Sequence, residues 1–324
     1  MTGRLTKQAA IKNKMGRLMS SIKIELGGYQ PPTSVHNRAA KIFGEELAKR
    51  VGNAVDYTMD GNMVETKGIK AFDLPSMVEA GDLTMCYFAS SYMAERVPEV
   101  AIFDLPFVVK SREKAYAALD GELGDLLKEK FLSEMGVRIL GFWDNGFRHF
   151  TNGVREIRTP ADCEELKMRS MSSDVHQEFF RLLGFEPTFV DVADLVAKVK
   201  SGEIDAQENP LTNTYRFGIY HYHRHITLTA HFFGMVLVMV NNGIFESWPA
   251  DIQQAVRDSA DVATVAQLGF AQAEDDEVMA ALDPAENDIV ELSDDERQAF
   301  AEAVTPLVAK HRARLEDRLF ELVE

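Results

Sequence analysis

Segments with the apolar spacing of β-strands alternate along this chain with segments of helical spacing, and this alternation restricts the possible folds more than any other feature. Residues 22–26, 55–59 and 83–88 have the character of strands, while residues 35–51 and 69–80 have helical spacing and end at a glycine. Strand, helix and strand at these intervals are typical of a parallel sheet covered by helices. The first part of the chain is therefore predicted to form an α/β unit.

A second set of alternating strands and helices follows in the middle of the chain. Helices are predicted over residues 113–119, 123–134, 175–183 and 193–201, with a short one opening at Pro160, and strands over residues 137–143, 166–169, 187–190, 204–207 and 232–241. Almost all of the chain after Pro249 has helical character. Since no flexible linker separates the two sets, we expect an α/β protein of two lobes that exchange strands and enclose a cleft.

The overall charge restricts the class of partner. The chain of 324 residues carries 35 Lys and Arg against 51 Asp and Glu, a net charge of −16 at pH 7. Such a surface repels nucleic acid and anionic membranes, so neither is an expected partner. An anionic ligand would have to be bound by a few locally placed arginines acting against the overall field. Each arginine in a distinctive local sequence is therefore a candidate for ligand binding.

The cysteines and the N-terminus give further expectations. Cys86 lies in an apolar strand and Cys163 in an acidic helix start, so we expect two separate, inert thiols rather than a disulfide or a zinc site. Residues 1–21 are basic and lack the apolar run of an export signal, which predicts a mobile leader. The apolar run over residues 232–240 is too short for a transmembrane helix, and no other segment comes closer.

The sequence motifs of common enzymes are missing. The sequence contains no phosphate-loop, dinucleotide-binding, nucleophile-elbow or H-E-x-x-H motif. His221, His223 and His225 alternate and would share one face of a strand, as a metal site requires, but without a nearby carboxylate or cysteine ligand we interpret them as part of a polar, partly exposed connector. The acidic runs over residues 274–277 and 293–296 are interpreted as solvated helix faces or caps. No metal or cofactor is predicted.

Several short motifs occur in an order that resembles one family of binding proteins. They are P-E-V-A-I-F-D-L-P-F at 98–107, R-H-F-T-N at 148–152, T-P-A-D at 159–162, L-K-M-R at 166–169, L-G-F-E-P at 183–187 and G-E-I-D-A-Q-E-N-P at 202–210. From about residue 22 to its end, the chain resembles the solute-binding proteins of tripartite ATP-independent periplasmic (TRAP) transporters. It departs from their pattern at Phe185, where they have a small residue, and by lacking the glycine that precedes L-K-x-R.

The resemblance implies a fold and a division of the chain. It implies the two-lobed α/β fold of periplasmic binding proteins, in which crossing strands and a long helix connect lobes that close over an acid ligand. Lobe I is then predicted to contain residues 22–145 and 235–274, and lobe II residues 146–234 and 275–324, after the leader over residues 1–21.

The resemblance also implies that Arg169, the arginine of L-K-M-R, forms a bidentate salt bridge with the ligand carboxylate. The chemistry suits this role, because a guanidinium is a planar fork that matches a carboxylate and stays charged at any relevant pH. The alternative is a surface arginine paired with a nearby glutamate.

Further ligand contacts follow from the same motifs and from the ends of the predicted strands. Arg148 would supply a second cationic contact, with a structural pair between the lobes as the alternative. Asn209 would use its amide donor and acceptor to hydrogen-bond both a carboxylate oxygen and a hydroxyl group of the ligand. The alternative role for Asn209 is to form a turn before Pro210. Trp143 ends its strand and is either a cleft residue or a core aromatic. Because strand-end loops line α/β clefts, we also expect contacts from Tyr29, Gln30, Phe88, Ser90, Ser91 and Tyr92.

The resemblance implies a periplasmic monomer that captures a small mono- or dicarboxylate by lobe closure. Membrane permease subunits, using an ion gradient rather than ATP, would then accept the ligand. A sensor of the same fold that reports its ligand to a receptor is one alternative. A two-lobed enzyme acting on an anionic substrate is another, with His149, His176 or His231 as its acid or base.

Overall fold

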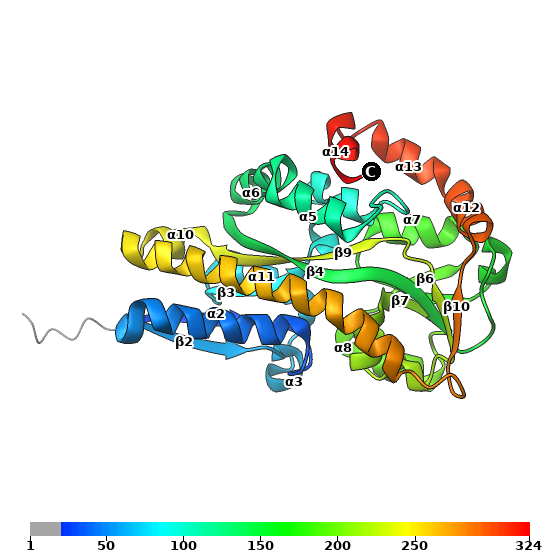
Figure 1. Ribbon diagram of the computed structural model, residues 1–324, viewed down its shortest axis with the longest axis horizontal. Coiled ribbons are helices and arrows are strands. Elements are labelled where there is room, and N and C mark those ends of the chain that lie inside the picture. Colours follow the sequence, from blue (N-terminus) through cyan, green and yellow to red (C-terminus); the bar gives the residue numbers. More distant parts are fainter. Residues whose placement is uncertain (1–20) are drawn as a thin grey trace, which may run out of the picture.

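The computed structural model describes residues 21–324 of the chain. The predicted leader over residues 1–21 therefore lies outside the described residues, apart from Ser21. Two lobes lie side by side along the longest axis of the molecule (Figure 1), which confirms the two-lobed α/β fold. Within residues 21–324, no helix combines the length and the apolar character needed to span a membrane.

The first lobe is built on a mainly parallel sheet from the N-terminal part of the chain. Its parallel strands are β1 (Ile22–Gly27), β2 (Val55–Asp60) and β3 (Met85–Ala89), in the order β2–β1–β3. The helices between them are α2 (Val35–Val51), α3 (Met63–Lys67) and α4 (Leu74–Ala80). The predicted helix over 69–80 is shorter than expected, because residues Ala71–Asp73 form a 3₁₀ turn and α4 begins only at Leu74, next to Pro75.

The second lobe contains the sheet formed by the middle of the chain. Its strands are β5 (Lys167–Ser170), β6 (Glu186–Phe189), β7 (Ala206–Pro210), β8 (His225–Leu228) and β10 (Asp288–Glu291), and its helices include α7 (Asp174–Leu182), α8 (Val192–Ser201) and α9 (Leu211–Arg216). β5 runs parallel to both β6 and β7. β8 and β10 pair with each other and were not predicted, because each has only four residues and little apolar alternation.

Two strands are shared by the lobes and join the sheets of both lobes into one continuous sheet. β4 (Val137–Asn152) and β9 (Phe233–Asn241) are antiparallel to each other, β9 also pairs with β3, and the C-terminal part of β4 pairs with β7. β4 is much longer than the predicted strand over 137–143, since the polar side chains that follow Trp143 are buried with polar partners. β4 has a bulge between Asp144 and Gly146. Gly146 has φ +90° there, a conformation that glycine adopts without strain.

The long connecting helix implied by the family resemblance is present. α11 (Ala250–Ala281) has 32 residues and extends along both lobes (Figure 1), packing on α2, β4 and α9. Its buried face is rich in alanine, which allows close approach to the strands beneath. The guanidinium of Arg38 on α2 lies 3.8 Å from the ring centroid of Phe270 on α11, a cation–π contact between the two helices.

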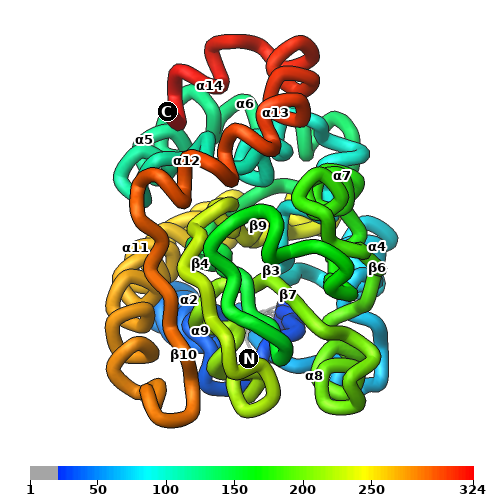
Figure 2. Tube along the Cα trace, turned by 90° about the vertical axis from the view of Figure 1, so that its right-hand side faces the viewer, coloured from blue at the N-terminus to red at the C-terminus, as the bar shows by residue number. Residues whose placement is uncertain are grey.

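Six further helices complete the described part of the molecule, and those at the C-terminus connect the lobes again. They are α5 (Arg112–Asp120), α6 (Glu122–Met135), α10 (Asn242–Glu246), α12 (Asp294–Ala303), α13 (Thr305–Arg312) and α14 (Asp317–Val323). Figure 2 shows the C-terminal helices beside α5 and α7, where α14 packs on α5 and α13 on α7. The C-terminal segment thus contacts both lobes, and the division of the chain by residue number remains a prediction.

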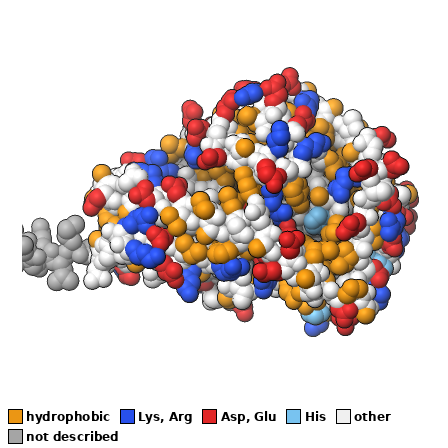
Figure 3. Space-filling model, in the orientation of Figure 1, with side chains coloured by type: hydrophobic (Ala, Val, Ile, Leu, Met, Phe, Trp, Pro, Cys, Tyr) orange, Lys and Arg blue, Asp and Glu red, His pale blue; other side chains and the backbone are white. Residues whose placement is uncertain are grey.

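The core and surface agree with the expectations from composition. One hydrophobic cluster runs through both lobes. Cys86 and Cys163 are free, buried thiols whose pKa values are raised by burial, so both are inert as predicted. Acidic and basic side chains are interspersed on the face seen in Figure 3.

Candidate ligand-binding site

Six of the ten predicted ligand-binding residues meet at a small cavity between the lobes. They are Tyr29, Gln30, Tyr92, Arg148, Arg169 and Asn209. The first three follow strands of the first lobe, and the others lie on β4, β5 and β7 of the second. The cavity has only about 20 Å³ of open space, room for about one water molecule. The lobes are thus closed on each other around these side chains.

Arg169 presents an unpaired cation to this cavity. It lies near the end of β5 and is only 2% exposed. Its Nε donates to the carbonyl oxygen of Val190 at 2.9 Å, which fixes the direction of the guanidinium. Among residues 21–324, no carboxylate pairs with Arg169 and no acceptor bonds its two Nη atoms. The predicted alternative, a surface pair with a glutamate, is therefore wrong for the described part of the chain.

Arg148, by contrast, is already paired. Its Nη2 donates to Oε1 of Glu208 at 2.7 Å and to the Glu208 carbonyl at 3.1 Å, while its Nε bonds Oε2 of the same carboxylate. Burial alone would raise the pKa of the Glu208 carboxyl, but Arg148, His176 and His231 hold it well below its usual range. The two residues lie on the adjacent strands β4 and β7, so this is a pair within one lobe, and the predicted pair between lobes is wrong.

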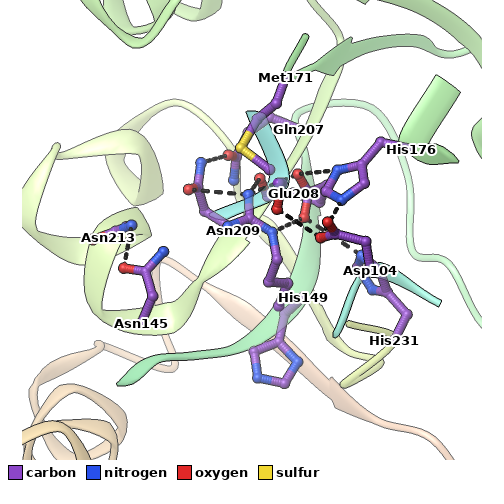
Figure 4. A network of polar contacts seen from close by, with 12 residues as sticks. Asp104, Asn145, His149, Met171, His176, Gln207, Glu208, Asn209, Asn213 and His231 are labelled. Atoms are coloured by element: carbon purple, nitrogen blue, oxygen red, sulfur yellow. Dashed lines mark hydrogen bonds and ion pairs between the residues drawn. The ribbon is translucent and has the colours of Figure 1, made fainter. Parts of the chain in front are cut away.

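A chain of buried polar groups extends from Glu208 to the first lobe (Figure 4). His176 Nε2 lies 2.8 Å from Oδ1 of Asp104, and its Nδ1 lies 3.8 Å from Oε1 of Glu208. Burial lowers the pKa of His176, but the two carboxylates outweigh it and the net shift is upward. Ser91 Oγ donates to the same Asp104 oxygen at 2.6 Å. Ser91, predicted to contact ligand, is instead held in this network.

The histidines considered as catalytic groups lie outside the cavity lining. Burial lowers the pKa of His231 to about 4 and that of His149 to about 3, so both are neutral at pH 7. His231 Nδ1 lies 2.6 Å from Thr229 Oγ1, and the backbone N–H of Ala230 donates to His149 Nδ1 at 3.1 Å. Together with His176, they have packing and hydrogen-bonding roles around Glu208 and β4.

Three further predicted ligand residues lie behind the cavity and not in its wall. Phe88 is fully buried and packs with its ring centroid 5.2 Å from that of Tyr29. Ser90 is also buried, and its Oγ has no partner among the described residues. Trp143 donates from Nε1 to Thr264 Oγ1 at 3.1 Å, which makes it the core aromatic of the stated alternative. Phe88 and Trp143 lie inside β3 and β4 and not at their ends, whereas Ala89, the last residue of β3, does line the cavity.

Other residues of the cavity wall were missed in the sequence. They are Ala89, Asn145, Met171, Val192, Asn213 and Phe217. Asn145 comes two residues after Trp143, where the predicted strand ends, and Asn213 follows the Q-E-N-P segment by one helical turn. The two amides face each other (Figure 4), with Asn213 Nδ2 donating to Asn145 Oδ1 at 3.4 Å. Asn209 lies inside β7, so the predicted turn before Pro210 is also wrong.

The remaining polar clusters have structural roles. His223 Nδ1 lies 3.0 Å from Thr151 Oγ1 and His225 lies beside Asp288, and residues 21–324 contain no group of three ligands suited to a metal. The acidic run at 274–277 is a solvated face only in part: Asp276 and Glu277 are exposed, but Glu274 is buried against Arg216 and Asp275 pairs with Arg112. The run at 293–296 is a cap, as predicted, with Ser293 and Glu296 forming a capping box.

Comparison with known proteins gives one family. Residues 26–315 match the model of the bacterial extracellular solute-binding proteins, family 7. The 2,3-diketo-L-gulonate-binding periplasmic protein of Escherichia coli K12 is 28% identical, over 86% of this chain and 83% of that protein. The C4-dicarboxylate-binding periplasmic protein of Rhodobacter capsulatus is also 28% identical, over 90% and 86%.

Solved structures agree in fold. The sugar acid binding protein of Advenella mimigardefordensis in complex with galactonate has a TM-score of 0.88 at 24% identity, covering 94% of this chain and 97% of that one. A TRAP periplasmic solute-binding protein of Shewanella oneidensis with bound succinate has a TM-score of 0.88 at 23% identity, covering 94% and 98%.

Proposed function

The chain belongs to family 7 of the bacterial extracellular solute-binding proteins, and on that basis we propose that it binds a small organic acid between its lobes through Arg169. Proteins of this family are the solute-binding components of TRAP transporters. These components deliver organic acids to the membrane permease subunits. The ligands bound in the two similar structures, galactonate and succinate, are carboxylic acids.

The observation that carries this proposal is the unpaired guanidinium of Arg169. A buried charge is costly unless it is paired, yet Arg169 is 2% exposed and has only the Val190 carbonyl as a partner among residues 21–324. A ligand carboxylate would supply both the missing charge and the acceptors for the two Nη atoms.

Lobe closure follows from the origin of the cavity wall. Tyr29 and Gln30 come from the first lobe, whereas Arg169 and Asn209 come from the second. A ligand that contacts both sets binds lobes that face each other closely better than lobes that are apart, and so shifts the population toward closure. Because the cavity now has room for about one water molecule, the lobes must lie slightly further apart around an acid of several carbons. The closed form is then the one that permease subunits would accept. We place this step in the periplasm, with the protein as a monomer.

The test is a thermal-shift screen against small mono- and dicarboxylates with wild type, Arg169→Ala and Arg181→Ala. Arg181 is an exposed arginine on α7, so its loss controls for removal of a positive charge. At least one acid should raise the melting temperature of wild type and of Arg181→Ala but not of Arg169→Ala. The role of Arg169 is refuted if the variant binds an acid as tightly as wild type does.

A further inference from the structure

We infer that the ligand is a monocarboxylate bearing several hydroxyl groups, a sugar acid in chemical class, and not a dicarboxylate. This ligand class rests on the proposed function, because it takes Arg169 as the partner of the carboxylate. It follows from two independent properties of the cavity wall, namely its charge and its uncharged hydrogen-bonding groups.

The charge of the wall matches one carboxylate. Its charged side chains are Arg148 and Arg169, and the charge of Arg148 is compensated by Glu208, which is fully buried. Another carboxylate, Asp191, lies just beyond the wall next to Val190 and is 4% exposed. A second ligand carboxylate would therefore lose its hydration without gaining an unpaired cation, close to two carboxylates of the protein.

The uncharged part of the wall suits hydroxyl groups. Gln30 is 1% exposed, and neither its Nε2 nor its Oε1 has a hydrogen-bond partner among residues 21–324. An amide offers a donor and an acceptor side by side, and a hydroxyl group is also both, whereas a carboxylate can only accept. A ligand hydroxyl thus satisfies both ends of the Gln30 amide, while a carboxylate would leave Oε1 unpaired and repelled.

The same chemistry is repeated on the second lobe. Asn145 and Asn213 share one long hydrogen bond of 3.4 Å, which leaves an amide donor on Asn145 and an amide acceptor on Asn213 for other partners. Burial raises the pKa of the phenols of Tyr29 and Tyr92, so both stay neutral and able to donate. An acid with an apolar chain would leave these groups unpaired, because a buried polar group without a partner is unfavourable.

The experiment is calorimetric titration with acids matched in length. The four-carbon set is butyrate, threonate and succinate, and the six-carbon set is hexanoate, gluconate and galactarate. Within at least one set we expect the hydroxylated monocarboxylate to bind about tenfold or more tightly than both other acids. A dicarboxylate that binds as tightly as its matched hydroxy acid, or an apolar acid that does so, would overturn the inference.

Gln30→Leu tests the amide separately. It should weaken the hydroxy acid by about tenfold and leave the melting temperature of the ligand-free protein close to that of wild type. Gln254→Leu, at an exposed position on α11, is the control and should change neither. Unchanged affinity in a folded Gln30→Leu protein would contradict the role of the amide.

The two proposals fail in different ways. If succinate or galactarate binds best and binding needs Arg169, the proposed function stands and the ligand class is wrong. If none of the six acids binds wild type, both are refuted for ligands of these lengths.

Discussion

Arg148 and Glu208 form a buried ion pair between the neighbouring strands β4 and β7, with 2.7 Å between Nη2 and Oε1. The exposed fractions of their side chains are 2% and 0%. The sequence places these residues 60 positions apart, each in a motif typical of ligand contact. Their pairing separates the roles of the two arginines in the cavity, because Arg148 is compensated within the protein and Arg169 is not.

Glu208→Gln should destabilise the protein strongly. It leaves Arg148 buried without a counter-charge and removes the negative charge that His176 and His231 face, so we expect a loss of about 3–5 kcal/mol in the free energy of unfolding. Urea unfolding at pH 7 measures it. Glu79→Gln is the matched control, since the Glu79–Arg96 pair is part-exposed at 34% and 44% and should contribute only about 0–1 kcal/mol. Equal losses in the two variants would contradict the importance of the buried pair.

His36 should make the protein sensitive to acid. It is 1% exposed, its ring stacks on Tyr87 with centroids 5.4 Å apart, and burial lowers its pKa to about 3. The unfolded chain therefore binds a proton near pH 6.5 that the folded protein binds only near pH 3, so stability falls as the pH decreases through this window.

His36→Phe keeps the stacked ring and removes the titrating group. Relative to this variant, wild type should lose about 1 kcal/mol in unfolding free energy for each pH unit between about pH 6 and pH 4. Urea unfolding at pH 7, 6, 5 and 4 gives both curves. The other buried histidines affect both proteins equally, so a constant difference between the curves would show that His36 does not titrate as expected.

Arg169→Lys should bind the acid less tightly although it keeps the positive charge. An ammonium group cannot form the two parallel bonds of a guanidinium with a carboxylate, and the bond from Nε to the Val190 carbonyl would also be lost. We expect a loss of affinity of roughly 10- to 100-fold, corresponding to one charge-assisted hydrogen bond. Titration with the best acid of the screen measures it, and wild-type affinity in the lysine variant would show that charge alone is recognised.

The elements with a strong apolar period could be predicted from the sequence, and the rest could not, for physical reasons. The ranges of β1, α2 and α6 differ from prediction by one residue at most at either end, since their pattern is local. The predicted strand ended at Trp143, well before the end of β4, because Asp144 and Arg148 are charged and so indicate a surface position. Their partners, Arg112 and Glu208, are known only from the structure. Such pairs depend on contacts between distant segments, which a single sequence does not contain.

The site shows the same division. The motifs predicted that Arg148, Arg169 and Asn209 meet at one site, and all three line the cavity. The motifs did not show that Glu208 of the same lobe neutralises the charge of Arg148. The contribution of Asn213 was missed because it lies on the short helix α9, whose position depends on α11 packing against it.

Contacts at the edge of the cleft connect the lobes and provide the last prediction. Phe72 of the first lobe and Phe189 at the end of β6 have ring centroids 6.2 Å apart and exposed fractions of 41% and 40%. Nearby, Lys70 Nζ lies 2.6 Å from Asp194 Oδ2. Since one partner of each pair belongs to each lobe, these contacts are lost when the lobes separate.

Phe72→Ala should speed release of the bound acid. An aromatic pair contributes about 0.5–1.5 kcal/mol, so its loss from the closed state should raise the release rate roughly 2- to 10-fold. Stopped-flow displacement of the bound acid measures this rate, and Tyr222→Ala is the control because Tyr222 is also 41% exposed but lies on the connector before β8. Lys70→Ala should have a smaller effect, since its pair with Asp194 is about half exposed.

The position of these contacts explains why they should act on the ligand at all. The segment that carries Phe189 and Asp194 also supplies the Val190 carbonyl that orients Arg169 and the Val192 side chain that lines the cavity. Separation of Phe72 from Phe189 therefore moves the support of the carboxylate-binding arginine together with the cavity wall. An unchanged release rate in Phe72→Ala would mean that the ligand alone holds the lobes closed.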